Sequence, residues 1–174
     1  MRLVRYGGAM SLDGYIAGPD GEYDWIAMDP EMDFAGFLAP FDTFLIGRKT
    51  FDAMRRMGNE AKAMSGIQNI VFSRTLKQSE FPYVVVRSDA EPFVRELKHK
   101  PGKDIALFGG GELFRSLLKA GLVDRIAMSV VPILLGSGIP MLPLTATKAR
   151  LRFRSQRLYP KTGTIFLEYD IVQP

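Results

Sequence analysis

Short apolar runs alternate with segments rich in glycine and polar residues along most of this chain, and the change of pattern is sharpest near residue 110. Ile105 to Phe108 form an uninterrupted apolar run, which is typical of a strand buried on both faces of a parallel sheet. Gly109, Gly110 and Gly111 end that run. The next apolar residues are spaced four apart, as on one face of a helix, and pair Leu113 with Leu117 and Phe114 with Leu118. We therefore expect a strand to pass into a helix across three glycines.

The same alternation of strand and helix patterns recurs on both sides of this junction. Apolar runs predict further strands at residues 3–10, 43–46, 67–72, 81–86 and 123–131. Helical spacing of apolar residues predicts further helices in the segments 30–38, 51–54 and 93–97. Ser88 and Glu91 resemble a capping box before the last of these helices.

The final part of the chain has a different pattern. Two strand patterns, at residues 149–159 and 164–172, flank a turn of Pro160 to Gly163 and predict a β-hairpin. Arg150, Arg152 and Arg154 alternate with Leu151, Phe153 and Ser155, so the arginines share one face of the strand. A solvated face explains these arginines better than a binding patch. The whole pattern predicts one α/β domain over residues 1–174, with three layers and a mainly parallel central sheet that ends in an antiparallel hairpin.

Composition narrows the chemistry. The chain has 174 residues, 47% of them hydrophobic, no cysteine and one histidine. Disulfides and a cysteine nucleophile are thereby excluded, and we expect no metal site, because His99 resembles a solvated helix end. The start of the chain lacks the apolar core of a signal peptide, and the apolar segment 126–135 is too short to span a bilayer. We expect a cytoplasmic protein with no membrane partner.

Phosphate-compatible residues follow three of the predicted strands: Gly47 to Thr50, Ser73 with Arg74, and Gly109 to Glu112. A glycine before a helix leaves backbone N–H groups free to bind an anion. One such turn could be purely structural, but cations such as Arg48 and Lys49 at a helix start oppose the helix dipole unless an anion binds there. The carboxyl ends of parallel strands meet at one edge. A dinucleotide fits this arrangement, and the basic residues favour the 2′-phosphate of NADP over NAD.

The loop after the first strand, residues 11–21, is rich in turn residues, and loops of this length are often functional. Trp25 follows it and is the only tryptophan. A large aromatic side chain here could either anchor the loop or form the wall of a ligand pocket.

Taken in order, these motifs resemble the dihydrofolate reductase-like fold, and in particular the C-terminal reductase domain of bifunctional riboflavin biosynthesis enzymes. The resemblance rests on Ser11 to Gly14, Gly47 to Thr50, Ser73 to Thr75, the three glycines, and Val131-Pro132. It implies that NADPH is the cofactor and that a small heterocyclic molecule is the substrate. It alone also implies a homodimer.

The resemblance further assigns roles to individual residues. By this resemblance, the residues expected near the pyrophosphate and 2′-phosphate are Gly47, Arg48, Lys49 and Thr50. Ser73 and Arg74 are expected near the adenosine. Those along the diphosphate are Gly109, Gly110, Gly111, Glu112 and Leu113. Ala9, Met10 and Ile16 would lie near the nicotinamide, with Met10 and Trp25 also on the substrate side.

The substrate side is less well defined. Reductases of the riboflavin pathway often have a lysine after the Asp-Gly pair, where this chain has Tyr15. A proton would come from water or from a carboxylate, with Asp33, Glu31 and Asp13 as candidates. The first two could instead be carboxylates that stabilise a helix N-terminus.

The predicted function is hydride transfer from NADPH to a C=N bond or conjugated heterocycle of the pterin, folate or pyrimidine type. The alternatives are a non-catalytic NADPH-binding module and a 5-amino-6-ribosylaminouracil phosphate reductase. A nucleic-acid partner is disfavoured, because the arginines of residues 150–157 lack clearly interleaved exposed aromatics.

Overall fold

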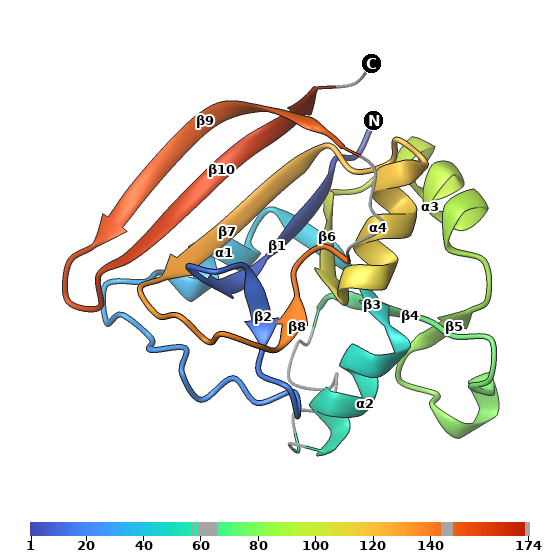
Figure 1. Ribbon diagram of the computed structural model, residues 1–174. Coiled ribbons are helices and arrows are strands. Elements are labelled where there is room, and N and C mark those ends of the chain that lie inside the picture. The colour runs from blue at the N-terminus through green and yellow to red at the C-terminus, as the bar shows by residue number, and fades with distance from the viewer. Residues whose placement is uncertain (57, 59–65, 144–147, 173–174) are drawn as a thin grey trace.

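The computed structural model describes residues 1–56, 58, 66–143 and 148–172 of the chain (Figure 1). Its strands are β1 (Val4–Ser11), β2 (Tyr15–Ala17), β3 (Phe41–Gly47), β4 (Gln68–Phe72), β5 (Val85–Arg87), β6 (Asp104–Gly109), β7 (Arg125–Val131), β8 (Ile139–Pro140), β9 (Arg150–Tyr159) and β10 (Thr164–Val172). Its helices are α1 (Phe34–Leu38), α2 (Arg48–Arg56), α3 (Ala90–His99) and α4 (Gly111–Lys119), together with the 3₁₀ helix η2 (Gln78–Glu80).

Eight of these strands form one sheet in the order β5-β4-β3-β6-β1-β7-β10-β9. The neighbours from β5 to β7 are parallel, whereas β10 runs antiparallel to both β7 and β9. This confirms the mainly parallel sheet with an antiparallel C-terminal hairpin. The parallel strands all end at one edge of the sheet, here called the carboxyl edge, which brings Ser11, Gly47 and Gly109 to the same side of the molecule.

Two apolar clusters cover the two faces of the sheet. On one face, Tyr6 of β1 stacks on Phe114 of α4 with ring centroids 3.8 Å apart, and Val94 of α3 joins the same cluster. On the other face, Phe44 and Ile46 of β3 pack with Phe51 of α2. Helices therefore form layers above and below the strands, and we name the two sides the α3/α4 face and the α1/α2 face. The helix α1 belongs to the second, because Phe37 contacts Phe41 and Phe166 on that face.

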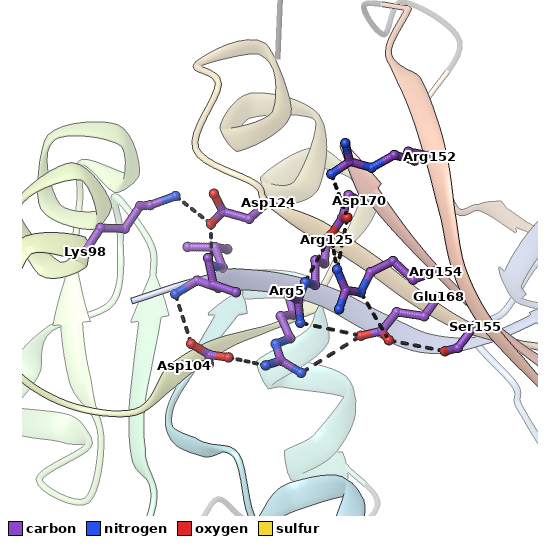
Figure 2. Close-up of polar contacts among 12 residues, drawn as sticks. Arg5, Lys98, Asp104, Asp124, Arg125, Arg152, Arg154, Ser155, Glu168 and Asp170 are labelled. Atoms are coloured by element: carbon purple, nitrogen blue, oxygen red, sulfur yellow. Dashed lines mark hydrogen bonds and ion pairs between the residues drawn. The ribbon is translucent and has the colours of Figure 1, made fainter. Parts of the chain in front are cut away.

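Charged side chains join the starts of β1 and β7 to the end of β10 (Figure 2). Arg5 pairs with Asp104 and lies 3.9 Å from Glu168, while Arg125 pairs with Glu168 and Asp170 at 3.9 and 3.2 Å. Glu168 and Asp170 are mostly buried, with 18% and 16% of their side chains exposed. These ion pairs hold β10 against the parallel part of the sheet.

The edge strand β9 is attached to the same acids. Arg154 and Arg152 donate to Asp170 at 3.0 and 3.1 Å, and Arg154 also lies 3.7 Å from Glu168. Burial by itself would raise the pKa of Asp170, but the hydrogen bonds from the two arginines lower it overall. The arginines of β9 therefore do not simply face solvent: two of them neutralise carboxylates of β10.

A β-bulge changes the faces of β9 midway along the strand. Phe153 lies opposite Tyr169 and Ser155 opposite Glu168, so Arg154 is the extra residue. Ser155 consequently points to the same face as Glu168 and donates a hydrogen bond of 3.3 Å to it. The expectation that Ser155 shares a face with Leu151 was wrong, because simple alternation does not account for a bulge.

Other differences from the sequence pattern are local. The strands β2 and β8, which pair with each other, were not expected, and the strand predicted at 81–86 is reduced to β5. The capping box was also wrong: Asp89 occupies the N-cap of α3, no side chain caps that helix among the described residues, and Ser88 donates instead to Asp89. Pro92 lies within the first turn of α3 and displaces the helix start from the position that the motif predicts.

Candidate functional site

The backbones of β3 and β6 make close contact at the carboxyl edge. A Cβ atom on Gly47 would lie 3.0 Å from the nitrogen of Gly110 and 3.2 Å from the oxygen of Gly109. Since both neighbours are backbone atoms, a side chain at this position would force the backbone to shift by a few tenths of an ångström. A Cβ on Gly111 would likewise lie 3.0 and 3.1 Å from the carbonyl oxygens of Pro140 and Met141. The glycines thus allow three chain segments to meet, and the Gly109–Gly110 peptide bond is cis.

Two helices begin at this meeting point. The helix α2 begins at Arg48, directly after Gly47, and α4 begins at Gly111, directly after Gly110. No described side chain caps α4 at Gly110. The hydroxyl of Thr50 lies 3.1 Å from the position of a Cβ on Gly110 and adds a polar group. The set of Gly47, Thr50, Gly109, Gly110 and Gly111 is here called the glycine corner, and its helix N-termini favour an anion.

Arg48 connects the glycine corner to the end of β4. Its Nε donates to Asp52 at 2.7 Å and its Nη1 donates to the hydroxyl of Thr75 at 3.0 Å. Ser73 accepts hydrogen bonds from the backbone of Thr75 and Leu76 at 3.2 and 3.1 Å, which fixes the turn after β4. A guanidinium group has five N–H donors, so Arg48 retains donors for a phosphate. The segment Gly47 to Thr50 therefore lies against Gly109 and Gly110 on one side and, through Thr75, against the turn that holds Ser73 on the other.

The remaining cofactor-binding candidates differ in whether their side chains can reach an anion. Lys49 and Arg74 are exposed and can turn toward an anion. Glu112 is exposed and pairs with Arg115 at 2.8 Å, while the side chain of Leu113 is buried in the core. These last two residues can contribute to an anion site only through their backbone N–H groups.

The first strand separates from β6 near its carboxyl end. The ladder between β1 and β6 covers only Val4–Tyr6 and Ile105–Leu107, whereas β1 stays paired with β7 as far as Ser11. Ala9, opposite Ser129, is half-buried on the α1/α2 face. Met10 points to the opposite face and packs on the core there. The structure thus assigns the two neighbours to different sides of the sheet.

Exposed phenylalanine rings border this separation on the α1/α2 face, and the sequence pattern did not mark them as functional. Phe108 is 41% exposed at the end of β6 and stacks on Phe44 with centroids 5.7 Å apart. Phe37 of α1 is also 41% exposed, and its ring lies 3.7 Å from the position of a Cβ on Gly7. Two partly exposed rings therefore lie on the α1/α2 face, one at the end of β6 and one over Gly7 of β1. The exposure of Phe108 was not predicted, because it belongs to an apolar run that resembles a fully buried strand.

Asp13 joins the loop after β1 to the loop after β7. Its carboxylate accepts from the hydroxyl of Ser11 at 2.6 Å and from the backbone of Gly136 and Leu135 at 2.7 and 3.1 Å. The Ser11 hydrogen bond is the main reason that the pKa of Asp13 is lowered, and the backbone donors add to the effect. This carboxylate is ionised near neutral pH and has the geometry of a loop anchor.

Glu31 and Asp33 lie at the start of α1, and both are exposed. Asp33 is the N-cap of α1 and accepts from the backbone of Gly36 at 2.8 Å, whereas Glu31 lies 3.6 Å from Lys161. Neither carboxylate is buried. The structure thus supports the helix-stabilising alternative for Asp33.

Asp29 is a buried carboxylate that sequence reasoning missed. It accepts from the backbone of Glu31 at 2.9 Å and from the backbone and hydroxyl of Thr162 at 3.1 and 3.2 Å. The Glu31 hydrogen bond contributes most to lowering its pKa, and those from Thr162 add to it. Asp29 thereby ties the segment before α1 to the hairpin turn. Its partner is remote in sequence, so no local signal identifies it.

Trp25 and Ile16 lie in or beside the loop after β1. Trp25 is half-buried and its Nε1 donates to the carbonyl of Glu22 at 3.3 Å, so the ring is fixed by its own loop. Ile16 lies in β2 and packs against the α3/α4 core. Within the described ranges, no cluster of His, Asp and Glu could hold a metal ion, and no helix is long and apolar enough to cross a membrane.

Comparison with known proteins identifies the fold. The structure aligns with dihydrofolate reductase of Enterococcus faecalis complexed with NADP(H) at a TM-score of 0.72, with 16% identity over 98% of this chain and 97% of that chain. It aligns with a protein of Shewanella sp. PV-4, named for a proposed role in riboflavin biosynthesis, at a TM-score of 0.82, with 23% identity over 98% and 99% of the two chains. In sequence, YyaP, an uncharacterized protein of Bacillus subtilis (strain 168), is 34% identical over 171 residues, or 92% of this chain and 90% of YyaP.

The fold is therefore the dihydrofolate reductase-like α/β fold that the sequence motifs indicated. Residues 2–163 match the RibD C-terminal domain. The chain belongs to the RibD C-terminal domain family.

Proposed function

We propose that this protein is an NADPH-dependent reductase that transfers hydride to a C=N or conjugated ring bond of a pterin-, folate- or pyrimidine-like substrate. The observation that supports this proposal most is the glycine corner, where two helix N-termini meet beside Arg48 at the carboxyl edge of the sheet. Membership in the RibD C-terminal domain family favours a reductase of the pyrimidine or pterin type.

The residues of this edge fit a dinucleotide with separated phosphates. The glycine corner offers N–H groups to a diphosphate, because its glycines leave the backbone accessible and α4 has no side-chain cap among the described residues. Arg48, Ser73 and Arg74 would hold the 2′-phosphate that distinguishes NADPH from NADH, and Lys49 would add a positive charge. When bound, NADPH supplies a hydride from C4 of its nicotinamide.

The substrate would lie on the α1/α2 face beside Ala9. Phe37 and Phe108 would hold a flat heterocycle and exclude water from the reacting atoms, and Ser129 beside Ala9 would offer a hydroxyl to a ring nitrogen or carbonyl. The proton would come from solvent or from Glu31 or Asp33, because the donors around Asp13 stabilise its ionised form.

Two other functions remain alternatives within the same site. A non-catalytic NADPH-binding module would keep the glycine corner and Arg48, and the exposure of both carboxylates at the start of α1 favours it. A 5-amino-6-ribosylaminouracil phosphate reductase would use the same edge, with Tyr15 in place of the lysine that often follows the Asp-Gly pair.

The proposal is tested by following NADPH oxidation with a panel of folates, pterins and ribosylated pyrimidines. At least one of these compounds should oxidise NADPH faster than it oxidises NADH, with reactions lacking enzyme or substrate as controls. Cofactor binding without oxidation of NADPH by any compound would favour the module. Failure to bind either cofactor would overturn the proposal as a whole.

A further inference from the structure

An open pocket of about 640 Å³ lies on the α3/α4 face, on the other side of the sheet from the proposed substrate position. It is bounded by α4, by the start of β7 and by the start of β9 (Figure 1). Its apolar lining includes Phe114 and Leu118 of α4, Ile126 of β7 and Leu151 of β9, and it is here called the α4 pocket. Its volume falls within the range of small-molecule sites, about 300–1,000 Å³.

The core fixes the inner wall of the α4 pocket. Phe114 has no exposed surface and stacks on Tyr6 with ring centroids 3.8 Å apart, and Ile126 is also buried. The outer wall is only partly covered, because Leu118 is half-buried and Leu151 is 44% exposed. A ligand would therefore remove apolar surface from water without any rearrangement of the inner wall. Preformed, mostly apolar pockets with few polar groups are typical of small-molecule sites.

The charged residues that line the α4 pocket are both cations. Lys148 and Arg150 are exposed, and no acidic residue is among the lining residues. In the described part of the chain, neither cation forms an ion pair with a carboxylate. Alternation along β9 places Leu151 on the pocket side and directs Arg150 to the opposite face, so Lys148, which precedes the strand, is the cation expected to contact a ligand. These charges complement a small apolar molecule with one negative charge.

The α4 pocket lies next to the glycine corner but shares no residue with it. The N–H of Phe114 donates to the carbonyl of Gly110 at 3.1 Å, so the pocket begins one turn after the start of α4. Met141 also lines the pocket, and its carbonyl oxygen lies 3.1 Å from the position of a Cβ on Gly111. The N–H of Met141 donates to the carbonyl of Gly14 at 2.9 Å, which ties the same residue to the loop after β1. Met141 therefore separates a ligand in the pocket from the proposed cofactor edge.

From this volume, the fixed apolar wall and the unpaired cations, we propose that the α4 pocket is a second ligand site, which binds a small apolar carboxylate. The carboxylate lies beside Lys148, and the apolar part lies between Leu118 and Leu151. Because the pocket is on the α3/α4 face, its ligand and a substrate on the α1/α2 face can be bound at the same time. The inference does not rest on the reaction that the protein catalyses.

Calorimetric titration of the full chain with 2-naphthoate tests the class of ligand, with 2-naphthamide as the neutral probe of the same shape. The wild type is expected to bind one naphthoate per chain and to bind the amide about five-fold more weakly, because only the carboxylate interacts with a cation. Lys148→Gln should weaken naphthoate binding about five-fold and leave amide binding unchanged. Lys119→Gln is the matched control: Lys119 is an exposed residue of α4 outside the pocket lining, and this variant should bind both probes as the wild type does.

Ala149→Phe tests the location of the site. Ala149 lines the pocket, is exposed and precedes β9, so a phenylalanine there fills the pocket without crowding the core. Naphthoate affinity should fall at least about ten-fold. Ala39→Phe, at the exposed C-cap of α1 on the opposite face, should leave the affinity unchanged. Thermal unfolding checks that each variant is folded, and if Ala149→Phe is not, Leu118→Trp fills the pocket from the side of α4 and should have the same effect.

The titration is repeated with NADPH present, and the same stoichiometry of naphthoate is expected because the pocket shares no residue with the glycine corner. Loss of naphthoate binding in the presence of NADPH would locate the probe at the carboxyl edge and overturn the inference. A wild-type protein that binds no naphthoate, or that binds the amide equally well, would also overturn it. So would undiminished binding by a folded Ala149→Phe or Leu118→Trp protein. Failure to bind NADPH would contradict the proposed function but not this site.

Discussion

Replacing Gly47 with alanine tests whether the glycine corner is built as described. The added Cβ would lie 3.0 Å from the Gly110 nitrogen and 3.2 Å from the Gly109 oxygen, closer than ordinary van der Waals contact. Overpacking of this kind costs about 1–3 kcal/mol, and the lower chain entropy of alanine offsets about 0.4–1 kcal/mol of it. We therefore expect a net loss of about 1–2 kcal/mol. At roughly 2–4 °C per kcal/mol for a chain of this size, the Tm falls by several degrees.

Gly8→Ala is the matched control for this substitution. Gly8 also lies in a strand of the parallel part of the sheet, but a Cβ there would meet only the Met128 side chain, at 3.9 Å. The free energy of unfolding of Gly8→Ala should stay within about 1 kcal/mol of the wild-type value. Because Gly47→Ala moves α2 away from α4, it should also weaken NADPH binding. Equal Tm values for the two variants in calorimetry would refute the packing argument.

Two further substitutions test the polar contacts that hold the sheet and the loops. Lys98 is 4% exposed and donates to Asp124 at 2.5 Å (Figure 2), so Lys98→Met should lower the free energy of unfolding by about 3 kcal/mol in denaturant unfolding. Lys100→Met loses only an exposed ion pair with Glu96 and should lower it by less than about 1 kcal/mol. Equal losses for the two variants would contradict this account. Asp29→Asn should lower the Tm at neutral pH, and because the pKa of Asp29 is lowered in the folded state, the difference from wild type should shrink as the pH falls below about 4; a constant difference down to pH 2 would count against the role of its charge.

The glycine corner could be expected from the sequence because its determinants are local. An apolar run, glycines and a helical period lie next to one another at Ile105 to Leu118 and again, with a single glycine, at Thr43 to Met54. Parallel strands that alternate with helices end at the same edge of the sheet. The two segments could therefore be expected at that edge before any contact between them was known. The prediction of a mainly parallel sheet with a C-terminal hairpin followed from the same periodicity.

Features that depend on distant partners could not be derived in this way. The role of Asp29 could not be predicted from the sequence, because its partner Thr162 lies 133 positions away. The short strands β2 and β8 could not be predicted either, because they form by pairing with each other. The bulge at Arg154 reverses the alternation of β9, so Ser155 was assigned to the wrong face. Phe108 belongs to a run that indicates burial, but it lies beyond the part of β6 that pairs with β1, and its ring is 41% exposed.

The central claim is that the carboxyl edge binds NADPH through the glycine corner and Arg48, and calorimetric titration with NADPH and NADH tests it most directly. The wild type should prefer NADPH. Arg48→Ala should lose about 10–100-fold of its NADPH affinity, the equivalent of charge-assisted hydrogen bonds worth about 1.5–3 kcal/mol, while NADH affinity stays unchanged. Arg56→Ala removes the same charge from the far end of α2 and should bind both cofactors as the wild type does. A wild-type protein that binds neither cofactor, or an Arg48→Ala variant with undiminished NADPH affinity, would contradict the account.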